Sequence, residues 1–280
     1  MTSMENISQK EQTPWHRGTR SDERLVKVLE LNAKLYADKL TVSGLENISE
    51  VPPDRKVVLA VSHATDLDIP LAASVLCKYF DIAIVNQSTQ QHFLSDPVAN
   101  LGNRVPGLKH FLPVDYYSIS GIKKPSKFNP DNFTAMAKKM DEGKTVLIAV
   151  HNPSFKGKLE RAGYGATYLA DITDAVILPI AVNVHTKKPG EGGMVGHITA
   201  TILEHPEIDI RIGKPLDPPE IPGMDEFVAL FQKRKNHTPL SAEDIRRFDE
   251  LKKELKERSA QVLERVSELR EDRPETRPSQ

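Results

Sequence analysis

The stretch of sequence that decides the fold runs Val57-Val58-Leu59-Ala60-Val61-Ser62-His63-Ala64-Thr65-Asp66-Leu67-Asp68. Its apolar start is short, β-branched and bounded, which predicts a fully buried strand of a parallel sheet over Val57 to Val61. Ligands in open α/β sheets bind beyond the carboxyl ends of the strands, where His63 is expected. We therefore expect His63 and Asp68 to face one another across a strand-to-helix loop. There the carboxylate can hold the imidazole as a base.

Apolar runs alternate with helical patterns along the rest of the chain. Further strands are expected at Asp81 to Asn86, Phe111 to Asp115, Thr145 to Val150, Ala175 to Val184, Val195 to Leu203 and Ile208 to Ile212. Helices are expected at Glu23 to Lys39, Ile69 to Tyr79, His92 to Leu101, Asn132 to Glu142 and Gly165 to Ile172. This order predicts an α/β fold, with a mostly parallel or mixed β-sheet flanked by helices and a C-terminal helical extension.

The composition divides the chain into four parts. We expect a disordered N-terminal tail over residues 1–22, an α/β domain over 23–222, a charged helical extension over 223–270 and a disordered tail over 271–280. Within this extension, helices are expected at Asp225 to Lys233 and Ser241 to Leu269. In the second of them, apolar residues recur every seven positions at Phe248, Leu255, Val262 and Leu269. This spacing fits a surface helix packed on the domain, and it leaves open a self-association seam or a membrane-surface helix. Ser241 and Asp244 predict the N-terminal cap of that helix.

The overall composition is that of a soluble globular protein, with 28% charged and 39% hydrophobic residues. A formal net charge of −1 gives no reason to expect a nucleic-acid partner. The single cysteine, Cys77, excludes an internal disulfide framework and is expected to pack as a small hydrophobe in the reducing cytoplasm. No segment approaches the roughly 18 apolar residues of a membrane span. The helix expected at Glu23 to Lys39 leaves a peripheral membrane contact open.

Several segments around the opening stretch keep a common order. The lead-in Val42-Ser43-Gly44-Leu45-Glu46-Asn47 comes first, followed by Ser62 to Asp68, Pro113-Val114-Asp115-Tyr116, Gly143 to Ile148, Ala175 to Val182 and Gly213-Lys214-Pro215-Leu216. Together they resemble the glycerolipid acyltransferase superfamily of phospholipid synthesis, of the lysophosphatidic acid acyltransferase type. That family carries Asn-His-x-Ser-x-x-Asp where this chain has Ser62 to Asp68, with Thr65 in the serine place. The resemblance covers about residues 25 to 220.

The resemblance implies an acyltransferase. Such an enzyme would move a fatty acyl group from acyl-CoA or acyl carrier protein, as co-substrate, to a hydroxyl of a lipid-like acceptor. The resemblance implies no covalent enzyme intermediate, no metal and no other cofactor. His63 would act as the general base, and Asp68 would fix its tautomer and stabilise the imidazolium.

The chain departs from the family at the positions associated with the acceptor's phosphate. Tyr116 stands where the second motif has arginine, and His151, Asn152 and Ser154 stand where the third has glutamate, glycine and arginine. A phenol or a hydroxyl does not replace a bidentate guanidinium. Either the acceptor is not glycerol 3-phosphate or its monoacyl form, or nearby cations such as Lys156 take over the phosphate contacts. The residues expected to line the substrate site are Thr65, Tyr116, His151, Asn152 and Lys156.

Two other hypotheses stay open. The altered motifs fit a catalytically silent relative that binds lipid or acyl chains, although such a protein has no evident need for both His63 and Asp68. His63, Asp66 and Asp68 also have the ligand types of a metal-dependent hydrolase. Asp66 can equally cap the following helix, and no second cluster completes a ligand set in the sequence.

Overall fold

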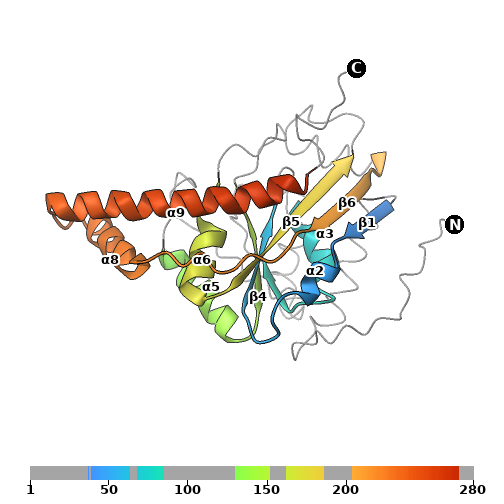
Figure 1. Ribbon diagram of the computed structural model, residues 1–280, viewed down its shortest axis with the longest axis horizontal. Helices are drawn as coiled ribbons and strands as arrows, with labels where there is room; N and C mark the ends of the chain where they lie inside the picture. Colours follow the sequence, from blue (N-terminus) through green and yellow to red (C-terminus); the bar gives the residue numbers. More distant parts are fainter. Residues whose placement is uncertain are drawn as a thin grey trace, which may run out of the picture.

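The computed structural model describes residues 37, 39–63, 68–84, 130–151, 162–185 and 204–270. Within these ranges the strands are β1 (Lys39–Ser43), β2 (Val57–Val61), β3 (Ile82–Ile84), β4 (Thr145–Ala149), β5 (Val176–His185) and β6 (Glu207–Ile212). The helices are α2 (Glu46–Ser49), α3 (Asp68–Leu76), α5 (Asp131–Asp141), α6 (Gly165–Thr173), α8 (Met224–Lys235) and α9 (Ala242–Glu268). The strands form one sheet with helices on both faces, and α9 runs along one side of the molecule (Figure 1).

The strand order is β1-β6-β5-β2-β4-β3. Strands β5, β2, β4 and β3 are parallel to one another, whereas β6 pairs antiparallel with β5 and carries β1 parallel to itself at the edge. The predicted mixed α/β sheet is therefore confirmed. Strand β2 lies between β5 and β4, and each of its residues is at most 1% exposed. The prediction of a fully buried strand with parallel neighbours is confirmed as well.

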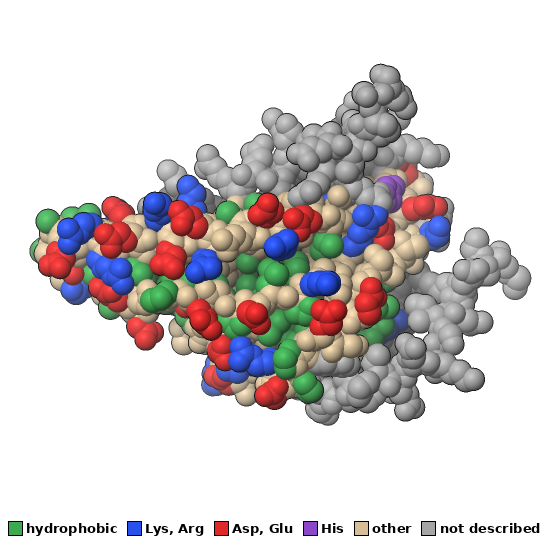
Figure 2. Space-filling model, in the orientation of Figure 1, with side chains coloured by type: hydrophobic (Ala, Val, Ile, Leu, Met, Phe, Trp, Pro, Cys, Tyr) green, Lys and Arg blue, Asp and Glu red, His purple; other side chains and the backbone are tan. Residues whose placement is uncertain are grey.

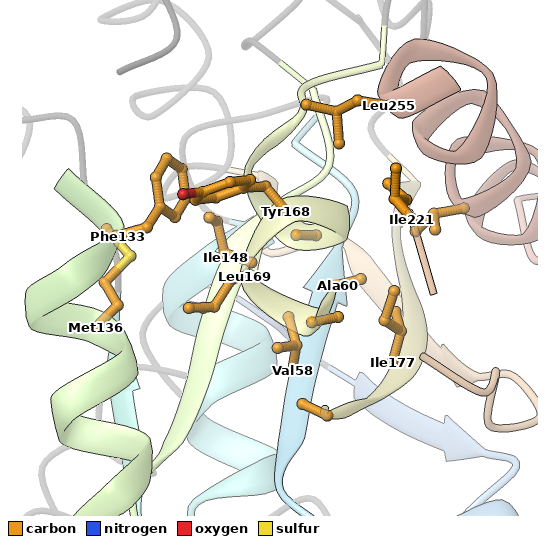
Figure 3. Close-up of a cluster of buried hydrophobic side chains, with 14 of the residues drawn as sticks. Val58, Ala60, Phe133, Met136, Ile148, Tyr168, Leu169, Ile177, Ile221 and Leu255 are labelled. Carbon is orange, nitrogen blue, oxygen red and sulfur yellow. The ribbon is translucent and has the colours of Figure 1, made fainter. Parts of the chain in front are cut away.

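The side chains of β2 alternate between two apolar clusters, one on each face of the sheet. The first cluster contains Val57, Leu59 and Val61 together with side chains of α2 and α3. The fully buried Cys77 belongs to the same cluster. Val58 and Ala60 pack in the second cluster with α5, α6, α8 and α9 (Figure 3). A strand covered on both faces needs no polar positions, which explains the uninterrupted apolar run.

Several predicted boundaries differ from the structure by a few residues. The sequence predicts an extended piece over Leu40 to Ile48 with a turn at Ser43-Gly44. The strand before the turn and the turn itself are found, but the part after the turn is wrong, because the chain there forms α2. Gly44 has φ +77°, and a Cβ there would collide with the backbone oxygen of Ile212. The end expected for the first helix is also wrong, since Lys39 belongs to β1.

Some predicted elements lie outside the described residues. These elements include the helix at His92 to Leu101 and the strands at Phe111 to Asp115 and Val195 to Leu203. Most of the helix expected at Glu23 to Lys39 also lies there. Both predicted tails lie there as well.

The C-terminal helices pack on the sheet. Helix α9 begins with the predicted cap, in which Ser241 Oγ accepts from the Asp244 N–H at 3.0 Å and Asp244 Oδ2 accepts from the Ser241 N–H at 3.2 Å. The seven-residue row is buried in the second cluster at Phe248, Leu255 and Val262, which fits the interpretation of a helix packed on the domain. Acidic and basic side chains are intermixed over the visible face of α8 and α9 (Figure 2).

The segment before α8 is tied to α6 by a carboxylate. The Ile221 N–H donates to Asp171 Oδ1 at 2.6 Å. Burial raises the pKa of Asp171, the bond from Ile221 opposes that shift, and the carboxylates of Asp225 and Glu254 add to it.

In the part of the chain that the structure describes, no helix has the length and apolar content needed to cross a membrane.

Candidate active site

The candidate site lies where the chain leaves the central strand β2. Because β5, β2 and β4 are parallel, their carboxyl ends meet at one edge of the sheet. His63 follows β2 by two residues and is partly exposed, whereas Asp68 is the first residue of α3 and is fully buried. The structure therefore places the partly exposed His63 and the buried Asp68 at the two ends of one strand-to-helix connection.

Ser62 connects Asp68 to strand β5. Its backbone N–H donates to the Ile180 carbonyl at 2.9 Å, which continues the β2–β5 ladder by one bond. Its side-chain Oγ accepts from the Val182 N–H at 3.0 Å and donates to Asp68 Oδ2 at 3.3 Å. Ser62 and Asp68 are both 0% exposed. Through these two hydrogen bonds, the Ser62 hydroxyl connects the backbone of β5 to the buried carboxylate of Asp68.

The carboxylate of Asp68 sits in a favourable electrostatic position. A buried charge costs free energy unless hydrogen bonds or other charges compensate it. The Ser62 hydroxyl provides one such bond, and the N-terminus of α3 adds the positive end of a helix dipole. Both contacts stabilise negative charge on the Asp68 carboxyl group.

His151 reaches the same connection from the other side of β2. It follows β4 and is only 4% exposed, and its Nε2 accepts from the backbone N–H of His63 at 2.9 Å. The β2–β4 ladder continues up to this point, because the Val150 N–H donates to the Val61 carbonyl at 3.0 Å. The imidazole of His151 therefore contacts the backbone of His63.

The predicted site residues fall into two groups. The structure brings His63, Asp68 and His151 together at one edge of the sheet. Four others lie outside the described residues, namely Thr65, Tyr116, Asn152 and Lys156. Ser62 is not among the predicted site residues, although a polar residue directly after a five-residue buried strand is a usable signal.

No group of three or more His, Cys, Asp and Glu side chains is arranged to hold a metal ion within the described ranges. Asp66, which the metal hypothesis needs, lies outside these ranges.

No protein-family model matches the chain, and no curated protein matches its sequence. Among solved structures, the chain is similar to the crystal structure of the 1-acyl-sn-glycerophosphate (LPA) acyltransferase PlsC from Thermotoga maritima. The similarity has a TM-score of 0.49 and 15% sequence identity, and it covers 92% of this chain and 81% of that one. Similarity at this level assigns no activity, so the residues of the site must support the function.

Proposed function

We propose that the protein is an acyltransferase that moves a fatty acyl group from a thioester donor, acyl-CoA or acyl carrier protein, to the hydroxyl of a lipid-like acceptor. The observation that carries the proposal is the placement of a partly exposed His63 and a buried Asp68, anchored through Ser62, at the two ends of one strand-to-helix connection. The order of sequence segments described above supports the same reaction class.

In the proposed reaction, the His63 imidazole takes the proton of the acceptor hydroxyl while its oxygen attacks the thioester carbonyl. The tetrahedral intermediate then collapses, the carbon–sulfur bond breaks, and an ester forms. The leaving thiolate takes the proton back from the imidazolium, which returns His63 to its starting state. Asp68 orients the imidazole and stabilises its charged form.

The chain offers no cysteine for a covalent route. Its single cysteine, Cys77, is 0% exposed and contacts the Ser74 carbonyl at 3.4 Å through Sγ. A buried thiol of this kind is not accessible to a thioester. Direct attack by the acceptor hydroxyl needs no such thiol.

The test is a thiol-release assay with acyl-CoA, run with phosphate-bearing and phosphate-free acceptors. His63→Ala should lower turnover by roughly 10²- to 10⁴-fold, which is the usual contribution of a general base. His237→Asn is the matched control, because His237 is exposed in the turn after α8 and asparagine tolerates its φ of +57°. Full turnover in the folded His63→Ala protein would overturn the proposal.

A catalytically silent protein that binds lipid or acyl chains is the second candidate. The replacement of the family's arginines, with Tyr116 at one of the positions, favours it. It predicts acyl-chain binding without thiol release for every acceptor tested. Turnover that depends on His63 would exclude it.

A further inference from the structure

We propose that His151 is a positioning residue for His63, and that it acts as a neutral imidazole whose proton is on Nδ1. Its link to the backbone of His63 rests on the geometry alone. Its effect on turnover rests on the proposed acyl transfer.

The direction of the hydrogen bond fixes the tautomer. A backbone N–H can only donate, so Nε2 of His151, 2.9 Å from the His63 nitrogen, must present a lone pair. A proton on Nε2 would place two N–H groups against each other. The ring is therefore neutral and carries its single proton on Nδ1.

The contact replaces a bond of the sheet. In a regular parallel ladder, the His63 N–H would donate to the Val150 carbonyl, which is the next acceptor after the bond from the Val150 N–H to Val61. The Gly163 N–H instead donates to that carbonyl at 2.6 Å. The imidazole of His151 takes over as acceptor, and the chain can turn away from β4 at His63 without losing the bond.

This substitution sets where the His63 side chain begins. The backbone nitrogen of His63 is one bond from the Cα that carries the proposed base, so a shift of this nitrogen moves the imidazole. A displacement of about 1 Å between reacting groups can cost about 10²-fold in rate. Loss of the hydrogen-bond acceptor that His151 provides should therefore lower kcat by about 10- to 100-fold, with a smaller change in KM.

Two variants of His151 test whether a hydrogen-bond acceptor at the position of Nε2 is needed, or whether any polar side chain is enough. In His151→Gln, the amide oxygen stands as many bonds from Cβ as Nε2 does, so it can accept from the His63 N–H. In His151→Asn, the oxygen is one bond closer to Cβ and falls short. Both amides are polar and uncharged, so a general effect of polarity would be the same in the two variants.

The experiment combines nuclear magnetic resonance of the full-length protein with kinetics. Isotope-labelled histidine reports the tautomer, and the signal that disappears in His151→Gln is that of His151. We expect the Nδ1–H form in the wild type, and a His63 amide protected from hydrogen exchange in the wild type and in His151→Gln but not in His151→Asn. An Nε2–H tautomer, or equal exchange in the two variants, would overturn the link.

Kinetics test the positioning role separately. Turnover should be close to wild type in His151→Gln and about 10- to 100-fold lower in His151→Asn. Equal losses in the two variants, with the amide protected only in His151→Gln, would overturn the positioning role. If the resonance results hold and the wild type shows no thioester turnover, the proposed function fails while the link stands. If His151→Asn does not fold, the wild-type tautomer and the rescue by His151→Gln still decide the link.

Discussion

Replacing Ser62 by alanine tests whether one hydroxyl holds the buried carboxylate of the site. The Ser62 hydroxyl accepts from the Val182 N–H at 3.0 Å and donates to Asp68 Oδ2 at 3.3 Å. Val182 is 2% exposed and Asp68 is 0% exposed, so water cannot readily replace the lost bonds. Ser62→Ala therefore removes one bond from a buried backbone donor and one from a buried charge.

The expected cost follows from these two losses. A buried donor left without its bond costs about 1–3 kcal/mol, and a hydrogen bond to a charged group is worth about 1.5–3 kcal/mol. Because the bond to Asp68 is long at 3.3 Å, its contribution lies in the lower part of its range. We expect Ser62→Ala to lower the free energy of unfolding by about 2–4 kcal/mol. That is a large share of the roughly 5–15 kcal/mol that stabilises a typical domain.

The assay is urea unfolding of Ser62→Ala beside Ser74→Ala. Ser74 is also buried, at 3% exposure, but its hydroxyl only donates to the Leu71 carbonyl within α3. Alanine is the better helix former at that position, so Ser74→Ala should change the free energy of unfolding by less than about 1 kcal/mol. Equal effects of the two substitutions would refute the argument that the Ser62 hydroxyl joins β5 to Asp68.

A double-mutant cycle divides the cost between the two bonds. Ser62→Ala combined with Asp68→Ala should show a coupling of about 1–2 kcal/mol in the free energy of unfolding. A coupling of zero would assign the whole effect to the bond with Val182.

Two further substitutions test the C-terminal packing. Leu255→Ala should lower the free energy of unfolding by about 2–5 kcal/mol, because the Leu255 side chain is fully buried. Lys256 is exposed, so the control Lys256→Ala should lower it by less than about 0.5 kcal/mol. Similar values for the two variants in urea unfolding would contradict the packing of α9 in the core. Asp171→Asn should raise Tm near neutral pH, because burial raises the pKa of Asp171 and its charged form therefore disfavours folding above that value. The gain should shrink as the pH falls to the ordinary carboxyl range, where Asp171 is protonated in both states. A gain in calorimetry that does not vary with pH, or an equal gain for the exposed control Asp249→Asn, would count against this explanation.

The elements with the clearest local signals could be predicted from the sequence. The β2 strand and α9 were found close to their observed bounds, because a bounded β-branched run and a capped amphipathic pattern each specify one structure. The pairing of β1 with β6 could not be predicted in the same way. Lys39 lies opposite Glu207 in that pairing, and contacts so distant in the chain leave no local pattern.

The partner of α9 was ambiguous for a different reason. A seven-residue apolar repeat suits a helix packed on its own domain as well as a helix that pairs with a second chain. Only the burial of residues such as Leu255 against the second cluster separates these cases.

The candidate site was predictable to the extent that it is local in sequence. His63 and Asp68 are visible from their spacing and from the strand before them. The contacts of Ser62 with Val182 and of His63 with His151 depend on the register of β2 against its two neighbours. Register is a property of the assembled sheet, and a single sequence does not reveal it.

On each side of β2, a side-chain acceptor replaces a backbone carbonyl of the sheet and supports one of the two candidate catalytic residues. On the β5 side, a regular ladder would take the Val182 N–H to the Ser62 carbonyl, and the Ser62 hydroxyl accepts it instead. On the β4 side, the His151 ring accepts from the His63 N–H in place of a carbonyl. A base and its orienting carboxylate need a precise relative position, and a loop alone gives neither residue a rigid support. Side-chain acceptors at the two exits of β2 let the chain leave the sheet while the His63 backbone stays bonded beside β4 and Asp68 stays linked to β5. This requirement explains why Ser62 and His151 are polar at buried positions beside an otherwise apolar strand.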